Sequence, residues 1–230
     1  MLQRPTREQT LVMNRLLPQG FCIYEHYGRP RDFTLLDEEE HCMRDAVQRR
    51  RREFSTGRHC ARTAVALLGL PPSAITRRAN GSPCWPRGVV GSITHCRGYT
   101  AAAVARQDTV LAFGIDAEPN TPLPPSVTSA ITTPAERKAL SRNAQVRPGI
   151  HWDHVLQSAK ESVFKAWWPS TQKALDFTDA HLTFDLISGG FTAHLHPRLA
   201  DDIPMPVISG RWQVHQELIQ TVAFVPHGPS

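Results

Sequence analysis

Three acidic residues and one lysine have the types and the spacing to bind a divalent cation and a phosphate group. Asp116 and Glu118 close an apolar stretch, and side chains at i and i+2 of a strand point to the same face. Glu161 and Lys165 are four residues apart, which places two side chains on one stripe of a helix. If this strand and this helix meet, three carboxylates and one ammonium converge. Such a group of side chains could hold Mg²⁺ and a phosphate chain.

Each pair also has a simpler interpretation. The two strand acids could be solvated, and the helical pair could be an exposed i,i+4 contact worth roughly 0.3–0.5 kcal/mol. The aromatic residues Phe164, Trp167 and Trp168 favour a largely buried helix and so weaken the second alternative. His194-x-His196 and His151-x-x-His154 have spacings reminiscent of zinc ligands. The first lacks a third ligand and the second lacks an H-E-x-x-H pattern, so we predict no zinc site.

The positive charge of the chain is concentrated in one segment. The net charge is +5, and the seven arginines and two acids between positions 44 and 62 account for all of it. The arginines are Arg44, Arg49, Arg50, Arg51, Arg52, Arg58 and Arg62, and the acids are Asp45 and Glu53. The segment could be a solvated helix end. Its charge instead favours an anionic ligand. Because adjacent helical residues point in different directions, at most two of the four adjacent arginines could face that ligand.

Size and composition indicate an ordinary globular protein. The 230 residues suffice for one large domain or two small lobes, with 40% hydrophobic and 20% charged residues. No apolar run approaches the roughly 18 residues needed to span a bilayer, and the N-terminus lacks the apolar run of a secretory signal. The five cysteines contain no C-x-x-C pair, which argues against a disulfide framework. We expect a cytoplasmic protein with no membrane partner.

Hydrophobic periodicity predicts an α+β fold. Helices are expected over residues 8–17, 36–51, 58–68 and 151–168, and Pro169 is expected to end the last of them. A further helix is expected to begin after Thr133, which would be its N-cap. Strands are expected over 21–24, 89–94, 99–105, 110–117, 182–186, 191–196, 211–215 and 219–224. A proline-rich break at 119–125 lies near the lobe boundary, and we divide the chain into residues 1–111 and 112–230. Both halves place helices before strands, which favours two related α+β lobes.

Taken in order, five stretches resemble the 4′-phosphopantetheinyl transferase family, of the larger Sfp/EntD type. They are RREFSTGRHCAR, NGSPCWPR, GSITHC, GIDAE and SAKESVFKAWW, which together reach from the arginine-rich segment to the end of the longest predicted helix. G-I-D-x-E followed some forty residues later by K-E-x-x-x-K is specific to this family, and GRHCAR and GSPCWP are similar to its actinobacterial branch. The resemblance implies a pseudo-two-fold pair of lobes with the active site at their interface.

The resemblance also implies a reaction and a metal. A serine hydroxyl of an apo carrier protein would attack the β-phosphorus of coenzyme A, and 3′,5′-ADP would leave. Asp116, Glu118 and Glu161 would hold Mg²⁺, or alternatively Mn²⁺, against the pyrophosphate. Glu161 would act as the general base, directly or through a metal-bound water, and Lys165 would neutralise or protonate the leaving group.

The basic lobe would bind the nucleotide end of coenzyme A. Arg50 and Arg58 would grip its 3′-phosphate, and His95 would contact phosphate near the backbone of Ser92 and Thr94. His95 taken alone could equally be structural. Bidentate arginine–phosphate contacts are each worth roughly 1.5–3 kcal/mol when desolvated.

One position departs from the family pattern. Many relatives carry a lysine beside the turn glycine, and this chain has none at Asn80 or Ser82. Arg77 or Arg78 could substitute for it.

The expected partners are acyl, peptidyl or aryl carrier proteins of fatty-acid, polyketide and nonribosomal-peptide synthases, including siderophore pathways, and the expected state is a monomer. Two alternatives use the same features. A Mg²⁺-dependent coenzyme A or nucleotide pyrophosphatase would use the acids with water as nucleophile. A non-enzymatic nucleic-acid-binding protein would use the arginines, although its basic residues should be spread over a surface. We expect no nucleic-acid partner, because the basic surplus is confined to one segment.

Overall fold

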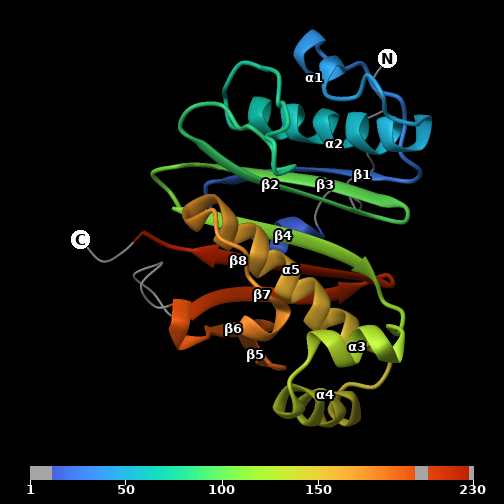
Figure 1. The fold of residues 1–230 in the computed structure, drawn as a ribbon, viewed down its shortest axis with the longest axis vertical. Coiled ribbons are helices and arrows are strands. Elements are labelled where there is room, and N and C mark those ends of the chain that lie inside the picture. The colour runs from blue at the N-terminus through green and yellow to red at the C-terminus, as the bar shows by residue number, and fades with distance from the viewer. Residues whose placement is uncertain (1–11, 200–206, 228–230) are drawn as a thin grey trace. The chain divides into compact units, whose positions relative to one another are not determined.

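The computed structural model describes residues 12–199 and 207–227. The chain folds into two compact units, an N-terminal unit that ends at Thr109 and a C-terminal unit that begins at Val110. Each unit combines an antiparallel sheet with a 20-residue helix packed against it, which confirms the predicted α+β fold (Figure 1). Within the described ranges no helix is both long and apolar enough to cross a bilayer.

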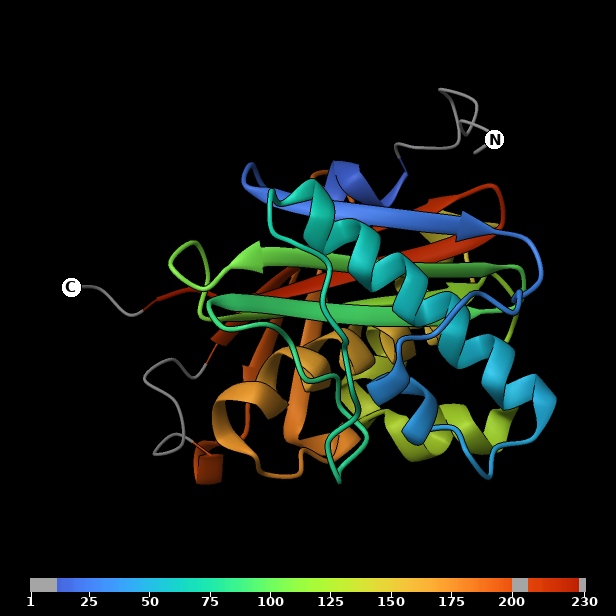
Figure 2. The same ribbon diagram turned by 90° about the horizontal axis from the view of Figure 1, so that it is seen from above.

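The N-terminal unit is built on a three-stranded sheet in the order β1-β3-β2. The strands are β1 (Phe21–Tyr27), β2 (Val89–Cys96) and β3 (Tyr99–Arg106), as predicted to within a few residues. Helix α2 (Gln48–Leu67) lies across all three strands (Figure 2). Ala61, Ala64 and Val65 on α2 pack against Ala102 and Val104 of the central strand. Small side chains on both surfaces let the helix approach closely.

The helices predicted over 36–51 and 58–68 are wrong in their boundaries. The structure has a short helix α1 (Asp37–His41) and then the single helix α2, so the adjacent arginines begin a helix instead of ending one. The interruption has a physical cause, since the chain must turn back for Glu39 to reach α2. The fully buried Glu39 carboxylate pairs with Arg62 and accepts a hydrogen bond from the Ile75 amide at 2.9 Å. The helix expected over 8–17 lies partly outside the described residues, within which Met13–Leu16 forms a 3₁₀ turn.

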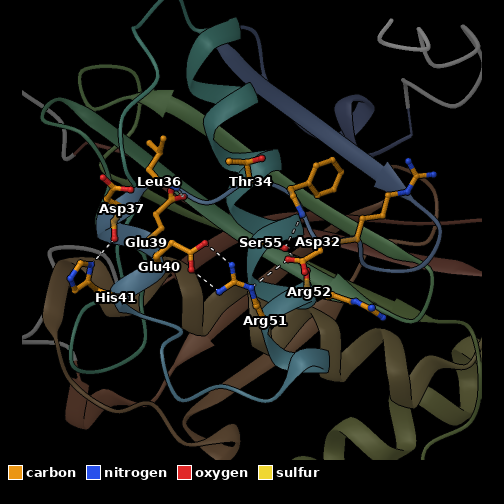
Figure 3. A network of polar contacts seen from close by, with 12 residues as sticks. Asp32, Thr34, Leu36, Asp37, Glu39, Glu40, His41, Arg51, Arg52 and Ser55 are labelled. Carbon is orange, nitrogen blue, oxygen red and sulfur yellow. Dashed lines mark hydrogen bonds and ion pairs between the residues drawn. The ribbon is translucent and has the colours of Figure 1, made fainter.

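A polar network binds α1 and the segment before it to the flank of α2 (Figure 3). The Arg51 guanidinium donates two hydrogen bonds to the Glu40 carboxylate at 2.5 and 2.6 Å and lies 3.5 Å from Asp32. Ser55 Oγ donates to the Arg31 carbonyl oxygen at 2.8 Å. The positive N-terminal end of the helix dipole disfavours a cation such as Arg51, and these acids offset that cost. Part of the basic segment is therefore neutralised within the fold.

The C-terminal unit is built on a five-stranded sheet in the order β4-β8-β7-β6-β5. Its strands are β4 (Ala112–Pro119), β5 (Ala180–Phe184), β6 (Gly190–Leu195), β7 (Val207–His215) and β8 (Leu218–Val225). Helices α3 (Pro125–Ile131), α4 (Pro134–Val146) and α5 (Trp152–Thr171) accompany the sheet, with 3₁₀ turns at Phe177–Asp179 and Pro197–Leu199. The predicted strands and the Thr133 cap of α4 are confirmed. Helix α3 was not predicted.

Helix α5 continues past Pro169, which contradicts the prediction that this proline halts it. Pro169 lies in the last turn, and the helix ends at Thr171, followed by the C-cap residue Gln172, whose φ of 54° is left-handed. The last turn is held by other bonds. Gln172 N donates to the Trp168 carbonyl oxygen at 2.8 Å, and Trp167 Nε1 donates to the Lys173 carbonyl oxygen at 2.9 Å. Near a helix end such contacts compensate for the hydrogen bond that proline cannot make.

Gly114 sets the distance between α5 and β4. A Cβ at this position would overlap the Ser162 carbonyl oxygen and lie 2.7 Å from Lys165 Cβ and 2.8 Å from Ala166 N. Gly114 therefore faces α5 directly. Since side chains at i, i+2 and i+4 of a strand share a face, Asp116 and Glu118 face the same helix. The close approach places α5 beside both acids.

We predict that Gly114→Ala lowers the free energy of unfolding by about 1–3 kcal/mol, because the methyl group must push α5 away from β4. Urea unfolding measures the change. Gly57→Ala is the matched control, since its Cβ would lie 3.5 Å from Ile93 Cγ2 in ordinary contact and within a helix. That variant should be as stable as the wild type or more so. Equal stability of Gly114→Ala and the wild type would contradict the packing argument.

Candidate active site

Asp116 and Lys165 form an ion pair where β4 and α5 meet. Lys165 Nζ donates to Asp116 Oδ1 at 2.6 Å and to the Ile115 carbonyl oxygen at 3.2 Å. Asp116 is 4% exposed, whereas the Lys165 side chain is 28% exposed. Burying a carboxylate without a counter-charge is costly, so the ammonium is what allows Asp116 to occupy this position. The ammonium also keeps access to solvent.

Glu161 belongs to the same electrostatic site. It lies one turn before Lys165 on α5 and is half-buried. Burial raises the pKa of Glu161, and the negative charges of Asp116 and Glu118 add to this effect against the opposing Lys165. A buried carboxylate beside other carboxylates either takes up a proton or binds a cation. The predicted strand pair and helical pair are therefore brought together.

Glu118 has a neighbour that sequence reasoning missed. His154 Nε2 lies 3.7 Å from Glu118 Oε2, and His154 Nδ1 lies 2.8 Å from the Thr121 carbonyl oxygen. The sequence analysis considered His154 only as half of a zinc-like pair with His151. A usable signal was present, because His154, Glu161 and Lys165 follow the helical spacing of seven and four residues on one stripe.

The carboxylate oxygens of these acids are suited to a hard divalent cation, although the side chains are not arranged as a complete metal site. Within residues 12–199 and 207–227 no three His, Cys, Asp or Glu side chains are grouped to hold a metal ion. Asp116 Oδ1 is engaged by Lys165. Three carboxylates beside a single ammonium nevertheless leave an excess of negative charge on oxygen donors. Such donors are the ligands that Mg²⁺ and Mn²⁺ prefer.

A pocket of about 210 Å³ opens beside Glu161. Its lining combines two carboxylates and an ammonium with apolar side chains and comes from α5 and the segment that follows it. The lining residues are Lys160, Glu161, Phe164, Leu175, Asp176, Phe177 and Ala180. The mixture suits a ligand that is mostly uncharged but carries polar groups.

Lys160 has a structural role in the wall of this pocket. It is 3% exposed, and its Nζ donates to the carbonyl oxygens of Ile131 and Phe177 at 2.7 Å each and lies 3.0 Å from Glu136 Oε1. Glu136 also accepts a hydrogen bond from the Leu182 amide at 3.0 Å. Burial lowers the pKa of Lys160, and the Glu136 carboxylate opposes that shift. The two lysines of K-E-x-x-x-K thus differ, since one ties the C-terminal unit together and the other pairs with Asp116.

In the N-terminal unit, Arg58 is a buried cation whose donors are incompletely used. It is 6% exposed, its Nη2 donates to the Thr76 carbonyl oxygen at 3.3 Å, and its guanidinium lies 4.1 Å from the centre of the Phe54 ring. Arg58 Nε is buried and has no hydrogen-bond partner within the described residues. Buried polar atoms are nearly always paired, so this donor is suited to an anionic ligand.

Two further arginines surround Arg58. Burial lowers the pKa of Arg58 to about 10, with Glu39 and Cys42 opposing the shift and Arg77 and Arg50 adding to it. Because the charges of Arg77 and Arg50 act on Arg58, three cations lie in one region. Arg50 is additionally 3.5 Å from Glu53. A cluster of cations of this kind is relieved when an anion binds.

The structure favours Arg77 over Arg78 as the substitute for the absent lysine. The Arg77 guanidinium covers the turn glycine, since a Cβ on Gly81 would lie 3.1 Å from Arg77 Nη2. Arg77 also influences the pKa of Arg58. Arg78 contributes backbone hydrogen bonds to the turn, from its amide to the Ser82 carbonyl oxygen and from the Gly81 amide to its own carbonyl oxygen.

The remaining predicted residues lie on β2. Ser92 and Thr94 are buried, whereas His95 is exposed, as the alternation of side chains along a strand requires. The side chain of His95 therefore points to the opposite face from the two hydroxyl side chains. Only the backbone of this strand is shared by all three residues.

Comparisons with known proteins give the family. Residues 38–105 match the 4′-phosphopantetheinyl transferase N-terminal domain, and residues 112–204 match the 4′-phosphopantetheinyl transferase superfamily. The chain is 44% identical to 4′-phosphopantetheinyl transferase PptT of Mycobacterium tuberculosis, over 86% of this chain and 88% of the relative. It is 49% identical to Svp of Streptomyces mobaraensis (83% and 78%) and 42% identical to Npt of Nocardia iowensis (91% and 98%).

These relatives are actinobacterial, so the resemblance seen in the sequence is confirmed in both family and branch. The chain belongs to the 4′-phosphopantetheinyl transferase superfamily and is an enzyme that transfers phosphopantetheine from coenzyme A to carrier proteins.

Proposed function

We propose that the group at the β4–α5 junction performs this transfer onto a carrier serine. The serine oxygen forms a bond to the β-phosphorus of coenzyme A, the bond from that phosphorus to the bridging oxygen breaks, and 3′,5′-ADP leaves. The observation that carries the proposal is the meeting of Asp116, Glu161 and Lys165, with Glu118 in the same electrostatic site. Phosphoryl transfer depends mostly on positioning and charge neutralisation, which these side chains supply.

The side chains have separate roles in this proposal. Asp116, Glu118 and Glu161 would hold Mg²⁺ or Mn²⁺, which supplies charge neutralisation at the pyrophosphate when bound. Glu161 accepts the proton of the serine hydroxyl, directly or through water. Lys165, with its partly exposed ammonium, donates to the leaving phosphate.

The pocket beside Glu161 is suited to the pantetheine arm. The arm is uncharged and carries amide and hydroxyl groups along an apolar chain, which matches a lining that combines Phe164, Leu175 and Phe177 with polar residues. Because Glu161 belongs to both the pocket and the acidic group, an arm placed here would lead directly to the reacting phosphate. Lys160 fixes the wall through the Phe177 carbonyl oxygen.

The lobe of residues 1–111 binds the nucleotide end of coenzyme A in this proposal, and the lobe of 112–230 carries the reacting groups. Arg50, Arg58 and Arg77 form the site for the 3′-phosphate. His95 and the backbone at Ser92 and Thr94 are further phosphate contacts. The incompletely bonded guanidinium of Arg58 and the mutual influence of the three arginines support this assignment.

The acceptors are acyl, peptidyl or aryl carrier domains of synthases. We infer a cytoplasmic location, where coenzyme A and these synthases meet. None of the five cysteines, all within the described residues, forms a disulfide, which suits a reducing compartment.

Intact-mass measurement of several apo carrier proteins, incubated with coenzyme A, Mg²⁺ and this protein, tests the proposal. We expect a mass gain of one phosphopantetheine on at least one carrier. Glu161→Gln should abolish most of this gain while retaining coenzyme A binding in calorimetry, because an amide cannot accept the serine proton. Wild-type turnover by Glu161→Gln would contradict the role of Glu161.

A control without carrier protein separates transfer from hydrolysis. Release of 3′,5′-ADP should depend on the carrier, since the serine is the nucleophile. Release at the same rate without carrier would favour the pyrophosphatase alternative.

We predict that Arg58→Gln weakens coenzyme A binding by about 10–150-fold, the equivalent of one charge-assisted contact worth roughly 1.5–3 kcal/mol. Binding of 3′-dephospho-coenzyme A should change little, because that molecule lacks the group that Arg58 contacts. Calorimetry with both ligands measures the difference. Arg52→Gln is the matched control, an exposed arginine on the same helix that should bind both ligands as the wild type does. An equal loss for both ligands in Arg58→Gln would contradict the 3′-phosphate assignment.

A further inference from the structure

The segment that follows β4 is fastened to the first turns of α5. Asn120 Nδ2 donates to the Gly149 carbonyl oxygen at 2.8 Å, and Asn120 Oδ1 accepts from the His151 amide at 3.0 Å. Asp153 Oδ2 accepts from the Leu123 amide at 2.9 Å. These bonds hold the chain on both sides of Thr121. The end of β4, where Glu118 lies, is thereby set against α5.

His154 lies among these hydrogen bonds, and the orientation of its ring is fixed. It is 8% exposed, and its Nδ1 lies 2.8 Å from the Thr121 carbonyl oxygen. A carbonyl oxygen can only accept, so Nδ1 carries the proton and the ring plane is set by this bond. Nε2 is then directed at Glu118, 3.7 Å from Oε2.

The surroundings of the imidazole make it a partner of Glu118 and not of the reacting groups. The charges that act on His154 are those of Glu118 and Asp153. Asp153 is already engaged with the Leu123 amide. Glu161 is seven residues further along α5, about 10 Å by helical rise, which keeps His154 away from the phosphate chemistry.

We propose that His154 is a positioning residue that orients the Glu118 carboxylate for metal binding. This inference rests on the proposed function, in which Glu118 is a metal ligand. A ligand carboxylate restrained by an outer partner loses less freedom when the cation binds. Removing such a partner weakens metal affinity by about 10–100-fold in known sites.

Two variants separate the contact of His154 with Glu118 from its hydrogen bond to the Thr121 carbonyl oxygen. In His154→Asn the side-chain amide nitrogen can replace Nδ1 and keep the bond to Thr121, while nothing reaches Glu118. In His154→Gln the longer side chain can place its amide nitrogen near the position of Nε2. We expect about tenfold or greater weakening of Mn²⁺ binding in His154→Asn, at an unchanged melting temperature. His154→Gln should recover most of the affinity.

The measurement is Mn²⁺ binding followed by electron paramagnetic resonance with coenzyme A present, together with the Mg²⁺ concentration for half-maximal carrier modification. His181→Asn is the matched control, because His181 lies 3.9 Å from a carboxylate oxygen of Glu136 outside the site, and it should bind Mn²⁺ as the wild type does.

Wild-type Mn²⁺ affinity in His154→Asn would overturn the inference. Equal weakening of Mn²⁺ binding in both His154 variants, with a lower melting temperature, would overturn it as well. Only the hydrogen bond to Thr121 would then matter. If the wild type itself neither binds Mn²⁺ with coenzyme A nor modifies carriers, the proposed function fails and the inference with it.

Discussion

The close contact between β4 and α5 is the constraint on which the site depends. Gly114 has no side chain, so the backbone of α5 near Ser162 can lie directly against the strand. The approach places the Lys165 ammonium 2.6 Å from the Asp116 carboxylate. The apolar core beneath α5 supports this geometry, because fully buried residues such as Val163 and Ala166 leave little freedom for the helix to shift. A costly group of like charges is therefore held by ordinary packing.

Charged side chains divide into those that build the scaffold and those that are left for ligands. In the N-terminal unit Arg51 and Arg62 are engaged by Glu40 and Glu39, whereas Arg58 keeps a buried nitrogen without a partner within the described residues. In the C-terminal unit the buried Lys160 is saturated by three oxygen-bearing groups. Structural pairs thus fix the elements that present the remaining charges, and net charge alone would not distinguish the two kinds.

Much of the fold and of the site could be predicted because the relevant signals are local. The two-residue spacing of Asp116 and Glu118 and the four-residue spacing of Glu161 and Lys165 follow directly from strand and helix geometry. The family motif supplied what spacing could not, namely that these two elements meet. The alternating strands of the C-terminal unit were likewise visible in the sequence.

The errors arose where distant contacts override local preference. The helix predicted over 36–51 breaks because Glu39 must reach Arg62 and the Ile75 amide, partners far along the chain. Helix α5 passes Pro169 because later side chains and backbone satisfy its last turn. The role of His154 was missed because helical spacing places it on the stripe of Glu161 and Lys165 but does not show that its ring is held by the backbone carbonyl of Thr121.

The most direct test of the central claim is a crystal structure of the protein with coenzyme A and Mn²⁺, in which anomalous scattering locates the metal. The account predicts one Mn²⁺ peak within coordination distance of oxygens from Asp116, Glu118 and Glu161, with Lys165 directed at the pyrophosphate. A peak bound by other residues, or a Glu161 side chain turned to solvent while the metal is bound, would contradict the account.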